Sequence, residues 1–210
     1  MPRYIDHDLR RDQVAAIAAD LVASRGVDAL TFRQVAEAAG CSTAIVSHYF
    51  TGKRDLLLST YRTASARSLA RFLAVTGTDG QPMQACLETL LPLDDDRRKD
   101  WRLWFAFWGI AAFDPELAAE QRERVRTARA RIRRVLDDEM GCETGCETGC
   151  ETGDDNGLDP DESQHTASRL LLLVHGIGTQ ALFDPDHWTP DRQRRAIRDE
   201  LTMIGRLRRG

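Results

Sequence analysis

The sequence predicts an all-α protein, with a three-helix helix-turn-helix unit at the N-terminus and a larger helical part behind it. Apolar residues recur at helical spacing from Phe32 to Ala39, which gives that segment one buried side. Residues 53–75 contain neither Gly nor Pro and are long enough for one extended helix. Residues 101–113 are apolar on nearly all sides, which is typical of a helix inside a core.

The first expected helix follows a loose arm at residues 1–8, in which Arg3 is available for a phosphate. Gly26 ends the helix. Its inner face comprises Val14, Ile17, Ala18, Leu21 and Val22. We expect this helix to brace the two short helices that come next.

Residues 31–55, TFRQVAEAAGCSTAIVSHYFTGKRD, form two short helices and the start of a third in this prediction. Thr31 and Gln34 make a capping box, and Gly40 can take the left-handed conformation that ends a helix. Ser42 is a good N-cap for the second helix. The buried face of that second helix is expected to comprise Ile45, Val46, Tyr49 and Phe50.

A helix, a turn containing Gly and a short polar-tipped helix form the pattern of helix-turn-helix DNA readers. The side of the second helix opposite its buried face suits a surface that enters a DNA groove. It exposes Thr43, Ala44, Ser47 and His48. An ordinary three-helix packing unit is the alternative that the spacing leaves open.

The residue identities in this stretch resemble the DNA-binding domain of TetR-type repressors over residues 8–65. The matching positions are Gly40, Ser42, Tyr49, Phe50, Lys53 and Leu56. Ser47 departs from the pattern, because many relatives place an aromatic residue there. The run STAIVSHYF, residues 42–50, is similar to the branch of choline-responsive repressors of betaine synthesis. The resemblance implies a homodimeric repressor that binds a near-palindromic double-stranded DNA operator and is released by a small-molecule inducer.

Composition and charge limit the possible classes. The 210 residues carry a net charge of −4, which argues against a general nucleic-acid coat protein. Residues 1–65 hold eight Lys and Arg against seven Asp and Glu, whereas the remainder holds 21 against 26. This distribution fits local docking on DNA through a few contacts. Since neither a signal peptide nor a membrane-spanning run is present, we expect a cytoplasmic protein with no membrane partner.

The remaining elements form the expected body. Helices are predicted at 83–91, 101–113, 163–183 and 190–207, and Asp114 begins a further helix whose many arginines are interpreted as a solvated face. Residues 1–53 are expected to be the DNA-binding domain, with the resemblance extending to about 65 through the connecting helix. Residues 54–210 are expected to be the ligand-binding and dimerisation domain, with a low-complexity loop at 141–162.

The candidate DNA contacts divide into base readers and phosphate binders. Thr43 and Ala44, near the start of the recognition helix, are expected to reach base edges, and Arg33 is a candidate for a guanine or a phosphate. Ser47 lies on the same exposed side. The expected phosphate contacts are Thr31, His48, Tyr49 and Lys53. Simple packing is the alternative for Tyr49.

The aromatic segment is the candidate inducer site, because small-molecule sites are lined by apolar and aromatic groups. Its residues are Trp101, Trp104, Phe105 and Trp108, and His175 is added as a candidate from a later helix. The resemblance favours a quaternary or polyamine cation, with Asp100 as the obvious counter-ion. A neutral apolar ligand and a purely structural core remain alternatives.

Three of the five cysteines, Cys142, Cys146 and Cys150, lie in a tandem Cys-Glu-Thr-Gly repeat. Their spacing matches no strong structural-zinc pattern, so we interpret the repeat as a duplication in a polar loop and expect no metal. A thiol- or metal-sensing repressor is one alternative function, and a ligand-independent DNA-binding protein is another. No catalytic motif is present, so we expect neither an enzyme nor a cofactor.

Overall fold

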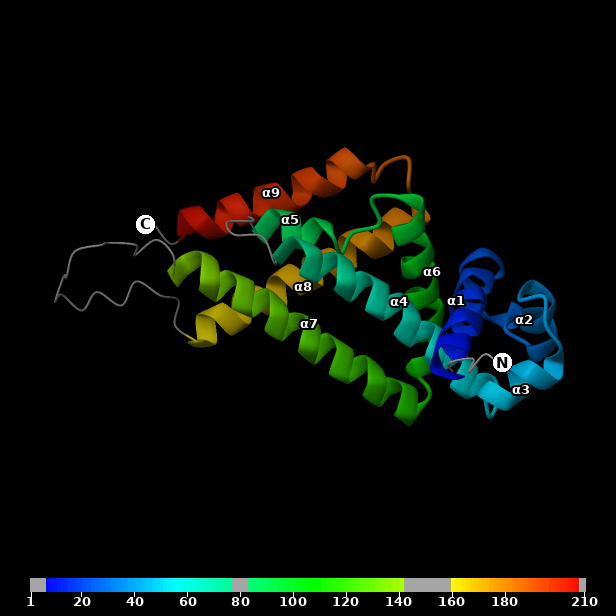
Figure 1. Cartoon of the computed structure of the whole chain (residues 1–210). Helices are drawn as coiled ribbons and strands as arrows, with labels where there is room; N and C mark the ends of the chain where they lie inside the picture. The colour runs from blue at the N-terminus through cyan, green and yellow to red at the C-terminus, as the bar shows by residue number, and fades with distance from the viewer. Residues whose placement is uncertain (1–6, 77–82, 142–159, 208–210) are drawn as a thin grey trace. The chain divides into compact units, whose positions relative to one another are not determined.

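The computed structural model describes residues 7–76, 83–141 and 160–207 (Figure 1). Within these ranges every regular element is a helix, which confirms the predicted all-α fold. The elements are α1 (His7–Arg25), the 3-10 helix η1 (Val27–Ala29), α2 (Phe32–Ala38), α3 (Thr43–Tyr49), α4 (Lys53–Thr76), α5 (Met83–Glu88), α6 (Asp95–Ala111), α7 (Pro115–Gly141), α8 (Pro160–Phe183) and α9 (Pro190–Leu207).

The chain divides into two compact units. The head unit comprises residues 1–70 and 94–121, and the body unit comprises residues 71–93 and 122–210. Helices α4 and α7 therefore contribute to both units. The predicted boundary after residue 53 separates functions, whereas these two units are defined by how the chain packs. The functional boundary therefore stays a prediction.

The core of the head unit unites the three N-terminal helices with α6. Helix α1 contacts both α2 and α6, and α2 contacts α3 (Figure 1). Val46 of α3 is fully buried in this core, and so are Leu103 and Phe107 of α6. The ring of Phe107 stacks on that of Tyr61 in α4, with 3.8 Å between the ring centroids. The aromatic helix is thus a structural part of the unit that contains the helix-turn-helix.

Two glycines end helices as the sequence predicts. Gly26 has φ 79° after α1, and Gly40 has φ 61° in the turn between α2 and α3. These are left-handed conformations that an L residue with a side chain adopts only at a cost. They fix the tight turns that bring α1, α2 and α3 together.

The predicted buried face of α3 is wrong at one position. Val46 is fully buried and Phe50 is 1% exposed, but Ile45 is 42% exposed. Val46 is the buried residue of α3, so the neighbouring helices cover only a narrow stripe of this helix. Ile45 lies beside that stripe and belongs to the exposed surface.

The body unit contains α5, α8 and α9, together with the later parts of α4 and α7. Helix α9 contacts both α5 and α8, and Figure 1 shows α5 alongside α9. Arg194 of α9 pairs with Glu88 at 3.3 Å, and Arg169 of α8 pairs with Glu200 of α9 at 2.6 Å. Helix α5 ends before the predicted Leu91, because residues 89–91 form tighter turns ahead of Pro92.

Candidate nucleic-acid interface

Helix α3 presents an exposed surface that is mostly polar. Val46 faces the core, whereas the side chains of the four predicted surface residues are exposed. These four residues are Thr43, Ala44, Ser47 and His48. A short helix with small polar side chains and a free outer face has the dimensions and chemistry to enter a major groove.

Both short helices are capped by the predicted side chains. The Ser42 hydroxyl oxygen accepts a hydrogen bond from the backbone N–H of Ile45 at 3.3 Å. The Thr31 hydroxyl oxygen accepts from the backbone N–H of Gln34 at 3.2 Å, and the hydroxyl donates to Gln34 Oε1 at 3.1 Å. A phosphate contact by the Thr31 hydroxyl would therefore have to replace its bond to the Gln34 side chain.

Two exposed cations flank α3. Arg33 in α2 and Lys53 at the start of α4 are both exposed, and neither has a carboxylate partner among the described residues. By contrast, Arg11 pairs with Asp55 and Arg54 pairs with Asp114. Lys53 also lies at a helix N-terminus, where its charge is unfavourable to the helix dipole and a nearby anion is favourable.

The end of α3 combines exposed and packed groups. The Ser47 hydroxyl donates to the Ala44 carbonyl at 3.1 Å, so its oxygen still has acceptor capacity. The His48 and Tyr49 rings meet edge to face with 5.3 Å between their centroids. Tyr49 is half-buried. Partial burial is compatible with both the predicted phosphate contact and the packing alternative.

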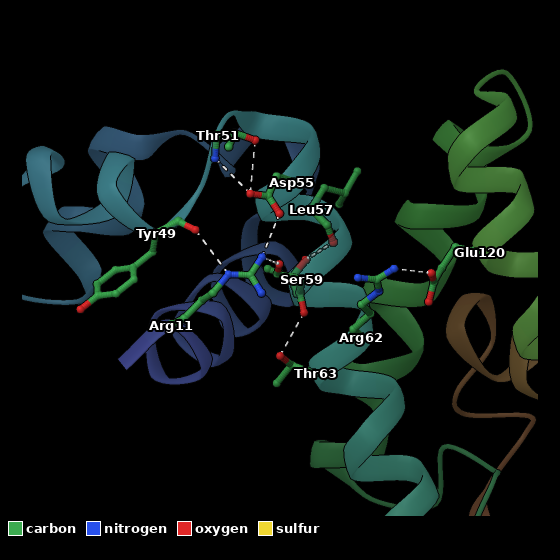
Figure 2. A network of polar contacts seen from close by, with 10 residues as sticks. Arg11, Tyr49, Thr51, Asp55, Leu57, Ser59, Arg62, Thr63 and Glu120 are labelled. Atoms are coloured by element: carbon green, nitrogen blue, oxygen red, sulfur yellow. Dashed lines mark hydrogen bonds and ion pairs between the residues drawn. The ribbon is translucent and has the colours of Figure 1, made fainter. Parts of the chain in front are cut away.

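The side chains that hold the C-terminal end of α3 against α1 and α4 were not predicted from the sequence. Arg11 in α1 bonds to the last residue of α3 and to Asp55 and Ser59 in α4 (Figure 2). The available signal was Asp55, an acidic residue in the first turn of α4, where carboxylates commonly accept backbone hydrogen bonds. Nothing in the sequence indicates which arginine it would meet.

A second set of contacts ties α4 to the start of α7 within the head unit. Arg54 pairs with Asp114 and, at 2.9 Å, with Glu116. Asp114 also caps α7, because its Oδ1 accepts from the backbone N–H groups of Glu116 and Leu117. The hydrogen bond from Arg54, together with these backbone bonds, lowers the pKa of Asp114 below its ordinary value. About two turns further along α4, Arg62 pairs with Glu120 at 2.7 Å.

The predicted ligand-binding aromatics of α6 have different environments. Trp101 is 1% exposed, and its ring contacts those of Trp104 and Trp108 at centroid distances of 5.5 and 5.9 Å. Trp104 and Trp108 are half-buried, and Phe105 is 42% exposed. The indole N–H of Trp104 is buried and has no hydrogen-bond partner within the described ranges. Trp104 and Trp108 are therefore better placed than Trp101 to meet a ligand.

The predicted inducer site also included His175, with Asp100 as the expected counter-ion. Asp100 is 1% exposed, and the Arg67 guanidinium donates to its Oδ1 from Nη2 at 2.6 Å and from Nε at 3.1 Å. That ion pair already compensates the carboxylate that we expected to serve as the counter-ion. His175 is half-buried in α8 of the body unit, and burial lowers its pKa, which favours the neutral imidazole.

No group of three or more His, Cys, Asp or Glu residues that could hold a metal occurs in 7–76, 83–141 or 160–207. Cys142, Cys146 and Cys150 lie outside the described residues, so their predicted role is untested. Among the described helices, none combines the length and apolarity needed to cross a bilayer.

Comparison with known proteins gives two family matches and full-length relatives. Residues 15–60 match the tetR family of bacterial regulatory proteins, and residues 81–206 match the C-terminal region of BetI-type transcriptional repressors. The HTH-type transcriptional regulator PksA of Bacillus subtilis (strain 168) is 25% identical over 207 residues, which cover 97% of this chain and 94% of that protein. The HTH-type transcriptional regulator BetI of Vibrio parahaemolyticus is 24% identical over 211 residues, with coverage of 96% and 94%.

Solved structures agree on the fold, and the family matches carry the assignment. A transcriptional regulator from Rhodococcus sp. Rha1 superposes with a TM-score of 0.75 at 27% identity, covering 92% of this chain and 95% of that chain. A transcriptional regulator from Saccharomonospora viridis, crystallised in complex with choline, superposes with a TM-score of 0.71 at 22% identity, covering 91% and 95%. These proteins are regulators, not enzymes. The chain belongs to the TetR family of bacterial transcriptional regulators and has a C-terminal region of the BetI repressor type.

Proposed function

We propose that this repressor acts in the cytoplasm as a homodimer on a near-palindromic operator and is released by a small-molecule inducer. The observation that carries the DNA-binding part is the pair of exposed cations, Arg33 and Lys53, on the helices that come directly before and after α3. Exposed cations without carboxylate partners are the groups that phosphates and guanine edges attract.

The two cations have different proposed roles. Arg33 and Thr43 read base edges, with Ala44 against a thymine methyl group. Lys53, together with Thr31, His48 and Tyr49, binds phosphates and so sets the position of the head on the duplex. Ser47 lies between these groups and is assigned to the same interface.

The test measures how the affinity of the protein for DNA depends on the base sequence and on the salt concentration. A duplex selected by the wild-type protein from a randomised pool is compared with a scrambled duplex of equal composition. Arg33→Ala and Thr43→Ala should each weaken binding to the selected duplex by about 1–3 kcal/mol. Binding to the scrambled duplex should change much less. Lys53→Ala should weaken binding to both duplexes alike. It should also reduce the slope of the salt dependence by the amount expected for about one phosphate contact.

Arg25→Ala is the matched control for charge. Arg25 is an exposed arginine at the end of α1, outside α2 and α3, so its loss removes the same charge without removing a proposed contact. A specificity change in Lys53→Ala but not in Arg33→Ala would reverse the assignment of base and phosphate contacts.

An exposed face of α8 supports the homodimer. Leu172 and Phe183 are 69% and 68% exposed, and Gly176 lies between them on the same side of the helix. A Cβ added at Gly176 would meet nothing within 4 Å, so another backbone can approach there. One recognition helix covers few base pairs, and a dimer presents two to successive major grooves about 34 Å apart.

The proposed inducer site is the half-buried indole pair of α6, Trp104 and Trp108. Indole faces bind cations with about 0.5–2 kcal/mol each. Choline is bound in the related Saccharomonospora viridis structure, which favours a quaternary ammonium ligand here. Because Arg67 compensates Asp100, selectivity for a cation would depend on the rings.

A thermal-shift screen tests the inducer proposal with choline and spermidine as cations and apolar neutral metabolites as the alternative. Stabilisation should be lost in Trp104→Ala and Trp108→Ala and kept in Phe113→Ala, which removes an exposed aromatic ring just beyond α6 and outside the predicted site. Stabilisation that survives both indole substitutions would place the site elsewhere. A ligand that stabilises the protein should also weaken the selected duplex, since it acts through its differential affinity for the two states.

A further inference from the structure

We propose that Arg11 is a positioning residue for operator recognition. Its guanidinium, with Asp55 and the turn at Thr51, holds the C-terminal end of α3 against α4. We call these three residues the Arg11 clamp. The inference rests on the proposed function, because it concerns how the α3 surface is aimed at DNA.

Arg11 joins three helices through one side chain (Figure 2). Its Nε donates to the backbone carbonyl of Tyr49, the last residue of α3, at 3.3 Å. Its Nη2 donates at 2.9 Å both to Asp55 Oδ1 and to the Ser59 hydroxyl in α4. The guanidinium carbon also lies 5.1 Å from the centroid of the Phe50 ring. The planar fork of arginine suits this arrangement, because a single ammonium donor could not span these acceptors equally well.

Asp55 extends the clamp to the turn between α3 and α4. Its second oxygen, Oδ2, accepts from the backbone N–H of Thr51 at 3.0 Å and from the Thr51 hydroxyl at 3.4 Å (Figure 2). The turn is therefore fixed from both sides, since Arg11 binds the residue before Phe50 and Asp55 binds the residue after it. Lys53, the proposed phosphate ligand, begins α4 two residues beyond Thr51.

Helix α3 needs an external anchor of this kind. Seven residues form too short a helix to be stable alone, and the last carbonyls of a helix have no partner within it. Burial of Val46 and Phe50 holds one side of α3 against the core, and the Arg11 hydrogen bond adds a polar contact at its C-terminal end. A cation at the C-terminal end satisfies a terminal carbonyl and interacts favourably with the helix dipole.

A change of tilt has a specific consequence for DNA binding. Base-edge hydrogen bonds require the α3 side chains to be placed within narrow distance limits, whereas attraction to phosphates decreases gradually with distance. Loss of the Arg11 clamp should therefore reduce discrimination between sequences more than it reduces binding to DNA in general.

The experiment compares Arg11→Ala with wild type on the selected and scrambled duplexes defined above. The preference for the selected duplex should fall roughly tenfold or more, comparable to the loss of one base contact. Arg10→Ala is the control, because it removes the neighbouring exposed cation, which donates a hydrogen bond to Gln13 in its own helix at 3.5 Å. An unchanged preference, or an equal loss on both duplexes, would overturn the inference.

Binding is measured well below the thermal midpoint that circular dichroism gives for each variant, so that global unfolding does not contribute. If Arg11→Ala does not fold, Asp55→Asn provides the same test, because Asn keeps an acceptor while losing the charge that pairs with Arg11. In variants that fold, Arg11→Ala and Asp55→Ala should combine less than additively, and additive losses would contradict a shared clamp. A selection that returns no shared sequence would overturn the proposed function itself, whereas a selected duplex preferred equally by wild type and Arg11→Ala overturns only this inference.

Discussion

At the scale of single residues, Asp114 has two tasks in the head unit. It caps the N-terminus of α7 and it pairs with Arg54 at the start of α4. The caps of α2 and α3, by comparison, each serve one helix. The charge state of this one side chain therefore affects two helices at once.

Asp114→Asn separates the two tasks, because asparagine retains the oxygen that caps α7 and loses the charge that pairs with Arg54. The folded-state pKa of Asp114 is below its unfolded value, so the stabilisation is complete above the unfolded pKa and is lost as pH falls through the folded one. We expect the gap between the thermal midpoints of wild type and Asp114→Asn to narrow as the pH falls through that range.

The control for this titration is Asp12→Asn. Asp12 is an exposed carboxylate on α1 that has no ion-pair partner among the described residues. A gap for Asp114→Asn that stays constant with pH would show that the Arg54 pair does not contribute through charge.

At the scale of elements, α6 has a fully buried side and a half-buried side. Trp101, Leu103 and Phe107 are buried, whereas Trp104 and Trp108 are half-buried. Periodicity predicted that this helix would be apolar nearly all round. It could not predict which ring would be covered, because that depends on where α1 and α4 pack against α6.

Trp101→Ala should therefore destabilise the protein by about 3–5 kcal/mol, since it empties a buried site of a large aromatic ring. Trp104→Ala should cost clearly less and should change ligand response instead. Chemical denaturation followed by circular dichroism gives both free energies of unfolding. Equal losses in the two variants would indicate that Trp104 is core.

Local signals explain why much of the fold was predictable. Thr31 and Ser42 cap the predicted helices, Gly26 and Gly40 end them, and α9 spans the predicted residues. The Arg11 clamp was not predictable, because the residues that Arg11 contacts lie 38 to 48 positions further along the chain and no local spacing relates them to Arg11. Ile45 was misassigned for the same reason, since the width of a buried face is set by neighbouring helices.

At the scale of the whole molecule, the exposed face of α8 determines assembly in our proposal. Leu172→Glu should place a charge in the proposed two-fold interface and shift the protein from dimer to monomer. Sedimentation velocity measures the change, and the selected duplex should be bound more weakly because one head then acts alone. Leu73→Glu is the control, because Leu73 is an equally apolar, 54% exposed residue that belongs to α4 and not to α8. A wild-type monomer at micromolar concentration would contradict the proposal.

The shared core of the head unit limits how the reading specificity of this protein can be transplanted. A chimera that exchanges only residues 1–53 would set a foreign α1 against Leu103 and Phe107, whose shapes fit the native one. Mismatched packing of this kind commonly costs about 1–3 kcal/mol, a large part of the stability of a small domain. A hybrid regulator should therefore carry α6 together with its own N-terminal helices, so that the grafted segment brings its matching core.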